Sequence, residues 1–168
     1  SMERIYAWHE GIQMFKWRPV FGVGKAEFMT HHFKTAHNSW VLVLAELGML
    51  GYIPWMAMIC YSVFQLWYKY KFLSDRLVEL GALTMREIRE RKIAFSLLFA
   101  IMGLLVAAFF ISRSYSVIIF LMCGLAVAQN GRMQALYLDY RVPAIAKPVF
   151  LVILFSIYLL HVVTMVMS

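Results

Sequence analysis

Residues 39–66 read SWVLVLAELGMLGYIPWMAMICYSVFQL and point to a membrane protein. Nearly all of them are apolar, and a helix needs about 20 such residues to cross about 30 Å of hydrocarbon. Glu46 lies near the start of the run and Pro54 near its middle. The run is longer than one crossing requires, which predicts a first span that is tilted or kinked at Pro54.

Further apolar runs follow at about residues 93–111, 115–128 and 149–167. The run 115–128 is short and ends at Gln129-Asn130-Gly131-Arg132, so it predicts either a tilted span or a re-entrant segment. Thr84 and Glu87 have the spacing of a capping box, so a helix should begin at Met85 and continue into the second span. We therefore expect an all-α membrane protein with about four transmembrane helices.

The composition supports this class. Of the 168 residues, 62% are hydrophobic and 15% are charged, whereas about a quarter of the residues in ordinary soluble proteins are charged. The net charge of +7 is spread over segments between apolar runs, without an aromatic and basic platform, so nucleic acid is not an expected partner. Cys60 and Cys123 lie inside apolar runs, where free thiols are more typical than a disulfide framework.

Residues 1–38 are expected to form a separate segment before the membrane region, residues 39–168. Apolar residues recur at helical spacing over residues 2–17, at Ile5, Trp8, Ile12 and Phe15, which predicts an amphipathic interfacial helix. Arg18-Pro19 should end it, and a polar loop follows to Asn38. No signal peptide pattern begins the chain, so we expect the targeting signal and further spans upstream.

Counts of Lys and Arg predict the orientation. Seven lie in the loop after the first span, about residues 67–92, one (Arg113) in the next loop and three in the third. The positive-inside rule then places the first and third loops in the cytoplasm, and residues 1–38 on the outer face. The cations of residues 1–38 run against this rule, which favours their binding an anion such as pyrophosphate. They are Arg4, Lys16, Arg18, Lys25 and Lys34.

His37 and Asn38 are the clearest candidates for chemistry. An imidazole at the membrane interface can accept a proton from a hydroxyl nucleophile at neutral pH. A helix continued through His37 would place Glu46 on the opposite side and small residues on the same face. That face would comprise Val41, Leu44, Gly48, Gly51 and Trp55. The alternative is an interfacial histidine that merely caps a helix.

Other polar residues allow two interpretations each. Arg4 and Trp8 are four residues apart, so the indole could orient the guanidinium for a pyrophosphate, or Arg4 could simply be exposed. Gly22 and Gly24 could offer backbone N–H groups to an anion, although Gly-Val-Gly is more often a turn. Glu46 is expected to be an interfacial carboxylate bonded to a neighbour.

The histidines do not predict a metal site. His31, His32 and His37, with Glu27 nearby, fit no standard zinc spacing, and no His-Glu-x-x-His stretch is present. His161 lies in the last apolar run, close enough to the headgroups for a structural role. No metal and no cofactor is expected.

Several short motifs, in one order, resemble the O-antigen ligase and polymerase superfamily over about the first third of the chain. They are Arg4-Ile-Tyr-Ala-Trp8, Arg18-Pro19-Val-Phe-Gly22-Val-Gly24 with Phe28, Ala36-His37-Asn38-Ser39 and Ala45-Glu46-Leu47-Gly48-Met49-Leu50-Gly51. Tyr52-Ile53 stands where ligases often carry Thr-Gly, so ligase, polymerase and protein O-glycosylation roles stay open. Family members are about twice this long or more, so this fragment alone should be inactive.

The resemblance implies a metal-independent, inverting glycosyltransferase of the bacterial inner membrane, with residues 1–38 periplasmic or extracellular. Such enzymes transfer a glycan from undecaprenyl pyrophosphate to a lipid, glycan or protein acceptor. His37 matches the histidine proposed as the base, and Arg4, with Arg18 a weaker candidate, matches the arginine that engages the pyrophosphate. Trp8, Asn38 and Glu46 complete the expected substrate-binding set.

Two other roles compete with this one. A transporter or flippase component for lipid-linked oligosaccharide should carry polar groups or broken helices near the midplane, where this chain has only Pro54 and a few hydroxyls. A purely structural membrane subunit predicts that changes at Arg4 and His37 are silent.

Overall fold

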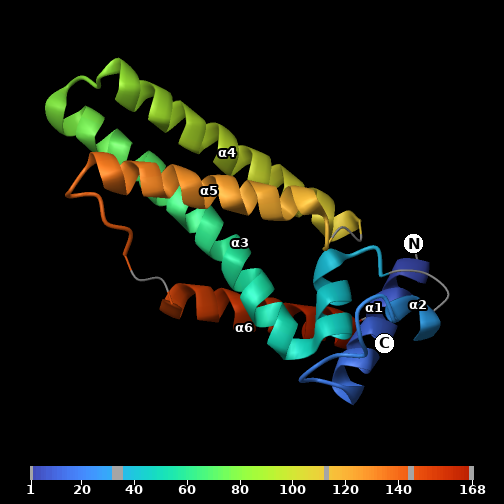
Figure 1. Ribbon diagram of the computed structural model, residues 1–168. Coiled ribbons are helices and arrows are strands. Elements are labelled where there is room, and N and C mark those ends of the chain that lie inside the picture. The colour runs from blue at the N-terminus through green and yellow to red at the C-terminus, as the bar shows by residue number, and fades with distance from the viewer. Residues whose placement is uncertain (1, 32–35, 112–113, 144–145, 167–168) are drawn as a thin grey trace. The chain divides into compact units, whose positions relative to one another are not determined.

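The computed structural model describes residues 2–31, 36–111, 114–143 and 146–166. The helices in chain order are α1 (Met2–Trp17), α2 (Phe28–His31), α3 (Ser39–Leu80), α4 (Met85–Phe110), α5 (Val117–Leu136) and α6 (Ala146–Val166). The described residues form helices and no strand, which confirms the all-α class (Figure 1).

Three of the described helices, α3, α4 and α5, are long and apolar enough to cross a membrane. Only 17% of the most apolar part of α4 and 28% of that of α5 is buried. Lipid, unlike water, can cover so much exposed apolar surface without a free-energy penalty. The chain is therefore an all-α membrane protein. In α6 the described apolar stretch is the shorter Val149–Tyr158, so the fourth span stays a prediction.

Helix α4 begins where the capping box predicts. The Thr84 N–H donates to Glu87 Oε2 at 2.9 Å, and the Glu87 N–H donates back to Thr84 Oγ1 at 3.3 Å. These two bonds satisfy backbone donors that have no partner inside the helix. The helix then runs without interruption from Met85 to Phe110.

Two helices extend beyond the predicted limits. Residues 67–80, predicted to lie in a loop, form the last part of α3, and α5 continues past Gln129-Asn130-Gly131-Arg132 to Leu136. Three polar residues of these extensions, Lys69, Gln129 and Arg132, form one cluster with Glu90. Lys69 Nζ lies 2.7 Å from Glu90 Oε2 and 2.9 Å from Gln129 Oε1, and Arg132 lies 2.9 Å from Glu90 Oε1. Paired in this way, the charges do not need a solvated loop.

The chain divides into two compact units. Unit 1 comprises Ser1–Ala57, Leu105–Ser116 and Ala146–Ser168, and unit 2 comprises Met58–Leu104 and Val117–Ile145. Within unit 2, the later part of α3 lies against α4 and α5, as Lys69, Glu90 and Gln129 show. Its buried core includes Leu73, Met133 and Tyr140. Unit 1 contains every candidate site residue named above.

Candidate functional site

Unit 1 is built around a break in α3 at Gly48. This glycine has φ 59° and ψ −163°, which is not a helical conformation. The sequence predicted a tilted span or a kink at Pro54, whereas the departure from helical geometry lies six residues earlier, at Gly48. Glycine adopts positive φ without the steric penalty of a Cβ, so a glycine is suited to this position.

The loop after α1 fills the hydrogen bonds that the break opens. In an unbroken helix, the N–H groups of Met49 and Leu50 would bond to the carbonyls of Ala45 and Glu46. Here the two carbonyls accept from Val23 (2.9 Å) and Gly24 (3.0 Å), and the two N–H groups donate to Pro19 (2.8 Å) and Val20 (3.1 Å). Four bonds to the loop thus replace two bonds within the helix, which keeps buried backbone groups satisfied.

Gly22 makes this close approach of two backbones possible. It has φ 70°, and a Cβ there would collide with the carbonyl of Glu46. A Cβ on Gly48 would lie 2.6 Å from the Val20 carbonyl oxygen and 2.6 Å from the Gly22 nitrogen. The Gly22 and Gly24 N–H groups donate to Arg18 and Glu46 carbonyls. Of the two interpretations of these glycines, the geometry favours the turn over anion contact.

His37 is not on a helix, contrary to the face predicted from 100° steps. α3 begins at Ser39, and Asn38 caps it: its Oδ1 accepts from the Trp40 N–H at 2.9 Å and the Val41 N–H at 3.3 Å. An N-cap residue lies outside the helix, so the chain before it is free to turn. His37 has φ 46° and an exposed side chain, and capping is done by its neighbour.

The residues on both sides of His37 are anchored. The Ala36 side chain is 0% exposed and its carbonyl accepts from Trp8 Nε1 at 2.8 Å. Asn38 is also 0% exposed. Among described residues its Nδ2 has no hydrogen-bond partner. A positive φ in a residue other than glycine costs about 1–2 kcal/mol, and these buried neighbours hold His37 in it.

Helix α1 carries Arg4 and Trp8, and Trp8 contacts the residue before His37. α1 makes its closest contact through small residues: Ala7 and Gly11 are buried, and a Cβ on Gly11 would meet Val41 at 2.5 Å. The predicted helix over residues 2–17 is thus confirmed. Of the expected apolar stripe Ile5, Trp8, Ile12 and Phe15, Ile12 is buried and the others are partly exposed. The larger side chains stay partly exposed because a close helix contact is made through small residues.

Arg4 is exposed one turn before Trp8 on the same side of α1. The described residues contain no cation–π contact between them, and the Trp8 ring instead packs edge-on against Phe109 at 5.7 Å. Of the two interpretations of Arg4, the geometry therefore favours the exposed arginine over stacking on Trp8. One helical turn is about 5.4 Å, so Arg4 still lies close to the residue that contacts Ala36.

Arg18 lies at the opposite end of α1. Its separation from Arg4 is 14 residues, or about 21 Å along a helix axis, and its guanidinium lies over the Trp17 ring at 4.8 Å. The structure therefore brings Arg4, Trp8 and His37 into one region and leaves Arg18 outside it.

Glu46 is buried rather than open to a substrate. Its side chain is 3% exposed, Oε2 accepts from the Tyr115 hydroxyl at 2.7 Å, and Oε1 accepts from the Phe28 N–H at 3.4 Å. Burial and this carboxylate raise the pKa of the Tyr115 phenol above its usual value, so the phenol stays a donor. The geometry favours Glu46 as a structural link between the start of α2 and the α4–α5 connection.

Sequence reasoning missed the α4–α5 connection as part of the site. Ser39 Oγ donates to the Ile111 carbonyl at 2.8 Å, and Ser114 Oγ donates to the Ser39 carbonyl at 3.0 Å. Trp55 Nε1 donates to the Ser114 carbonyl at 3.2 Å. About 70 residues separate these partners, and no spacing rule in a single sequence links them. The hydrogen bonds of Ser39 attach the first turn of α3, which follows His37 in the chain, to the α4–α5 connection.

Some predicted residues lie outside the description. His32, Lys34 and Arg113 are not among the described residues, and the side chains of His31 and His161 are not described. Among described residues, no group of three His, Cys, Asp or Glu side chains is placed to hold a metal ion. The candidate site therefore comprises Arg4, Trp8, Ala36, His37 and Asn38, with the α4–α5 connection as its support.

Comparison with known proteins gives one family match. Residues 1–56 match the family model described as O-antigen ligase. No curated protein and no solved structure matches the chain significantly. The match covers α1, α2, the helix break at Gly48 and His37, and it confirms the resemblance indicated by the ordered motifs. Residues 1–56 are thus similar to the O-antigen ligase family, and this likeness points to a ligase or polymerase role in polysaccharide biosynthesis.

Proposed function

We propose that this chain is the part of a glycosyltransferase that activates the acceptor. The donor is a glycan on undecaprenyl pyrophosphate, and the acceptor is a hydroxyl of a lipid, a glycan or a protein. The family match of residues 1–56 supports the glycosyltransferase class. The reaction takes place at the outer face of the bacterial inner membrane, where residues 1–38 would meet both substrates.

The geometry of His37 carries this proposal. Its imidazole is exposed while both flanking residues are fully buried, and its backbone is held at φ 46°. Strained residues held by their surroundings occur preferentially at functional sites, because a residue free of such a role would relax or be replaced. Here the buried neighbours Ala36 and Asn38 fix the backbone of His37, and with it the direction in which the exposed imidazole points.

The proposed chemistry is an inverting displacement. His37 accepts the proton of the acceptor hydroxyl as its oxygen attacks C1 of the donor sugar. The C1–O bond to the pyrophosphate breaks, and the electron pair leaves with undecaprenyl pyrophosphate. Arg4, exposed about one turn from Trp8, offsets the charge that develops on the departing phosphate. No metal ion is needed in this scheme.

Substitution of His37 tests the proposal in the intact protein. General base catalysis contributes about 10²- to 10⁴-fold, so His37→Ala should lower glycan transfer by at least about 10²-fold. Membranes are supplied with lipid-linked glycan and acceptor, and the glycosylated acceptor is measured. His9→Ala is the matched control, because His9 lies on α1 and contacts Gln13 rather than the site. Normal transfer by His37→Ala would rule out the base.

The same assay separates an enzyme from a transporter. A transporter moves the lipid-linked donor unchanged, so donor would disappear from one leaflet without any glycosylated acceptor. An enzyme yields acceptor product together with free undecaprenyl pyrophosphate. Arg4→Gln, compared with Lys16→Gln on the same helix, should lower transfer because only Arg4 lies near Trp8.

A further inference from the structure

The first turns of α4 separate their charges by direction. Glu87 and Glu90 are buried, at 4% and 1% exposure, and face α3 and α5. Arg86, Arg89 and Lys92, spaced by three residues, are exposed. Residues three apart share one side of a helix. The helix therefore presents a row of cations outward and keeps its carboxylates inside unit 2.

The inner carboxylates are already neutralised by other cations. Glu90 pairs with Lys69 at 2.7 Å and Arg132 at 2.9 Å, and Glu87 pairs with Arg76 at 3.2 Å. No described carboxylate forms an ion pair with Arg86, Arg89 or Lys92. The positive charge of this outer face is consequently uncompensated within the described part of the chain, which makes it complementary to an anion.

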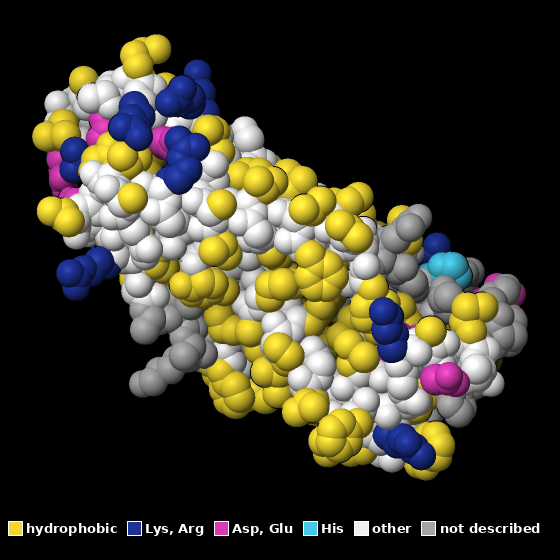
Figure 2. All heavy atoms as spheres, in the orientation of Figure 1, with side chains coloured by type: hydrophobic (Ala, Val, Ile, Leu, Met, Phe, Trp, Pro, Cys, Tyr) yellow, Lys and Arg dark blue, Asp and Glu magenta, His cyan; other side chains and the backbone are white. Residues whose placement is uncertain are grey.

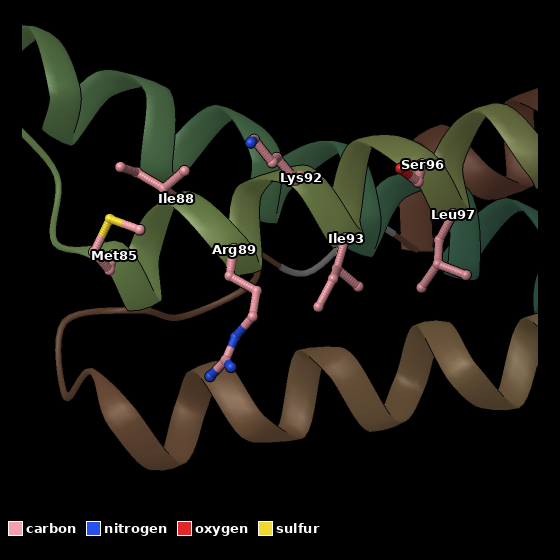
Figure 3. Close-up of a pocket in the computed structure, with 7 residues that line it drawn as sticks. All are labelled: Met85, Ile88, Arg89, Lys92, Ile93, Ser96 and Leu97. Atoms are coloured by element: carbon pink, nitrogen blue, oxygen red, sulfur yellow. The ribbon is translucent and has the colours of Figure 1, made fainter.

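An open groove runs along the same face, with a volume of about 490 Å³. Arg89 and Lys92 line it together with Ser96 and four apolar side chains (Figure 3): Met85, Ile88, Ile93 and Leu97. Met85, Arg89, Ile93 and Leu97 follow one another at intervals of four, so a cation is continued by an apolar stripe. The groove thus joins a charged end to an apolar one.

The charged end of the groove also lies where the headgroup of a membrane lipid would be expected. Figure 2 shows Lys and Arg side chains gathered over the end of unit 2 where α3 and α4 meet, with hydrophobic side chains covering the helices beyond. Trp67, exposed near this end, is typical of a membrane interface. From Arg89 to Leu97 the helix rises about 12 Å, close to the roughly 15 Å of hydrocarbon in one leaflet.

We propose that this groove binds an anionic bilayer phospholipid. Arg89 and Lys92 contact the phosphate, and one acyl chain lies along Ile93 and Leu97. The charge complementarity and the leaflet-length apolar stripe favour a phospholipid over a soluble anion, which would use only the cations. The site lies within α4 and does not depend on the proposed role of His37.

Lipid titration of the intact protein tests this site. Thermal unfolding in detergent is followed while phosphatidylglycerol or phosphatidylcholine with the same acyl chains is added. Phosphatidylglycerol should stabilise the protein and phosphatidylcholine should not. Arg89→Gln with Lys92→Gln should weaken the apparent affinity for phosphatidylglycerol about 25-fold, about fivefold for each cation removed.

The control removes the same charge elsewhere in unit 2. Lys71→Gln with Arg141→Gln takes two exposed cations from other segments and should leave the affinity within about twofold. Equal weakening by this control would overturn the site, because the attraction would then be general. Protection by inorganic phosphate alone, or tenfold tighter binding of undecaprenyl phosphate than of phosphatidylglycerol, would also overturn the assigned occupant.

Discussion

Replacing His37 by glycine should make the protein more stable and less active at once. A residue other than glycine at φ 46° carries about 1–2 kcal/mol of strain, which glycine removes. Glycine also makes the unfolded chain more flexible, which lowers the free energy of unfolding by about 0.5–1 kcal/mol. The His37 side chain is exposed, so few buried contacts are lost. The expected net gain is about 0.5–1 kcal/mol.

This gain is measurable as a rise in unfolding temperature. One kcal/mol corresponds to about 2–4 °C for a chain of about 150–250 residues and to less for a longer one, so His37→Gly in the intact protein should unfold up to about 4 °C higher in detergent. Glycan transfer should fall at least about 10²-fold in the same preparation. His37→Asn is a useful companion, because asparagine tolerates positive φ but cannot serve as the base.

Ala26 supplies the matched control. It has φ 68° in the loop before α2 and is exposed, so Ala26→Gly should raise the unfolding temperature by a similar amount and leave transfer unchanged. If His37→Gly kept full activity, the imidazole would not be the base. If His37→Gly destabilised the protein while Ala26→Gly stabilised it, the positive φ of His37 would not strain the folded protein.

Three further outcomes follow from the packing. Gly22→Ala should lower the free energy of unfolding by at least about 2 kcal/mol, because its Cβ would collide with backbone atoms. Gly103→Ala should cost nothing in thermal unfolding, because a Cβ there meets no described atom within 4 Å. Lys69→Met should cost about 1–3 kcal/mol, because the buried Glu90 Oε2 loses its partner while Oε1 keeps Arg132, against about 0.5 kcal/mol for exposed Lys71→Met; equal losses would contradict this. The raised pKa of Tyr115 contributes stability that is present below about pH 10 and lost as pH rises further; Tyr115→Phe should flatten that fall in unfolding temperature.

The helices could be predicted because long apolar runs leave few alternatives. The capping box before Met85 and the proline after Arg18 also identified helix ends correctly. The extents of α3 and α5 could not be predicted, because they depend on which charges find partners. Lys69 belongs to a helix because Glu90 and Gln129 neutralise it, and neither partner is recognisable from local sequence.

The candidate site was predictable in its residues but not in its geometry. The motif order predicts His37 and Arg4 as site residues, while the face drawn for a helix continued through His37 does not apply, because α3 begins at Ser39. Asn38 is a strong N-cap, and that local preference outweighs continued helix. The break at Gly48 was missed because its hydrogen bonds come from residues 19–24, and a single sequence gives no sign of such pairing.

The contact between Gly22 and Gly48 has a consequence for evolution. Each glycine is needed because the other backbone occupies the space of its Cβ, so the two positions form one steric unit although 25 residues lie between them. A substitution at either position can survive only if the loop is rebuilt as well. Distant homologues should therefore keep or lose both glycines together, and a search profile that scores them as a pair will discriminate better than one that scores each alone.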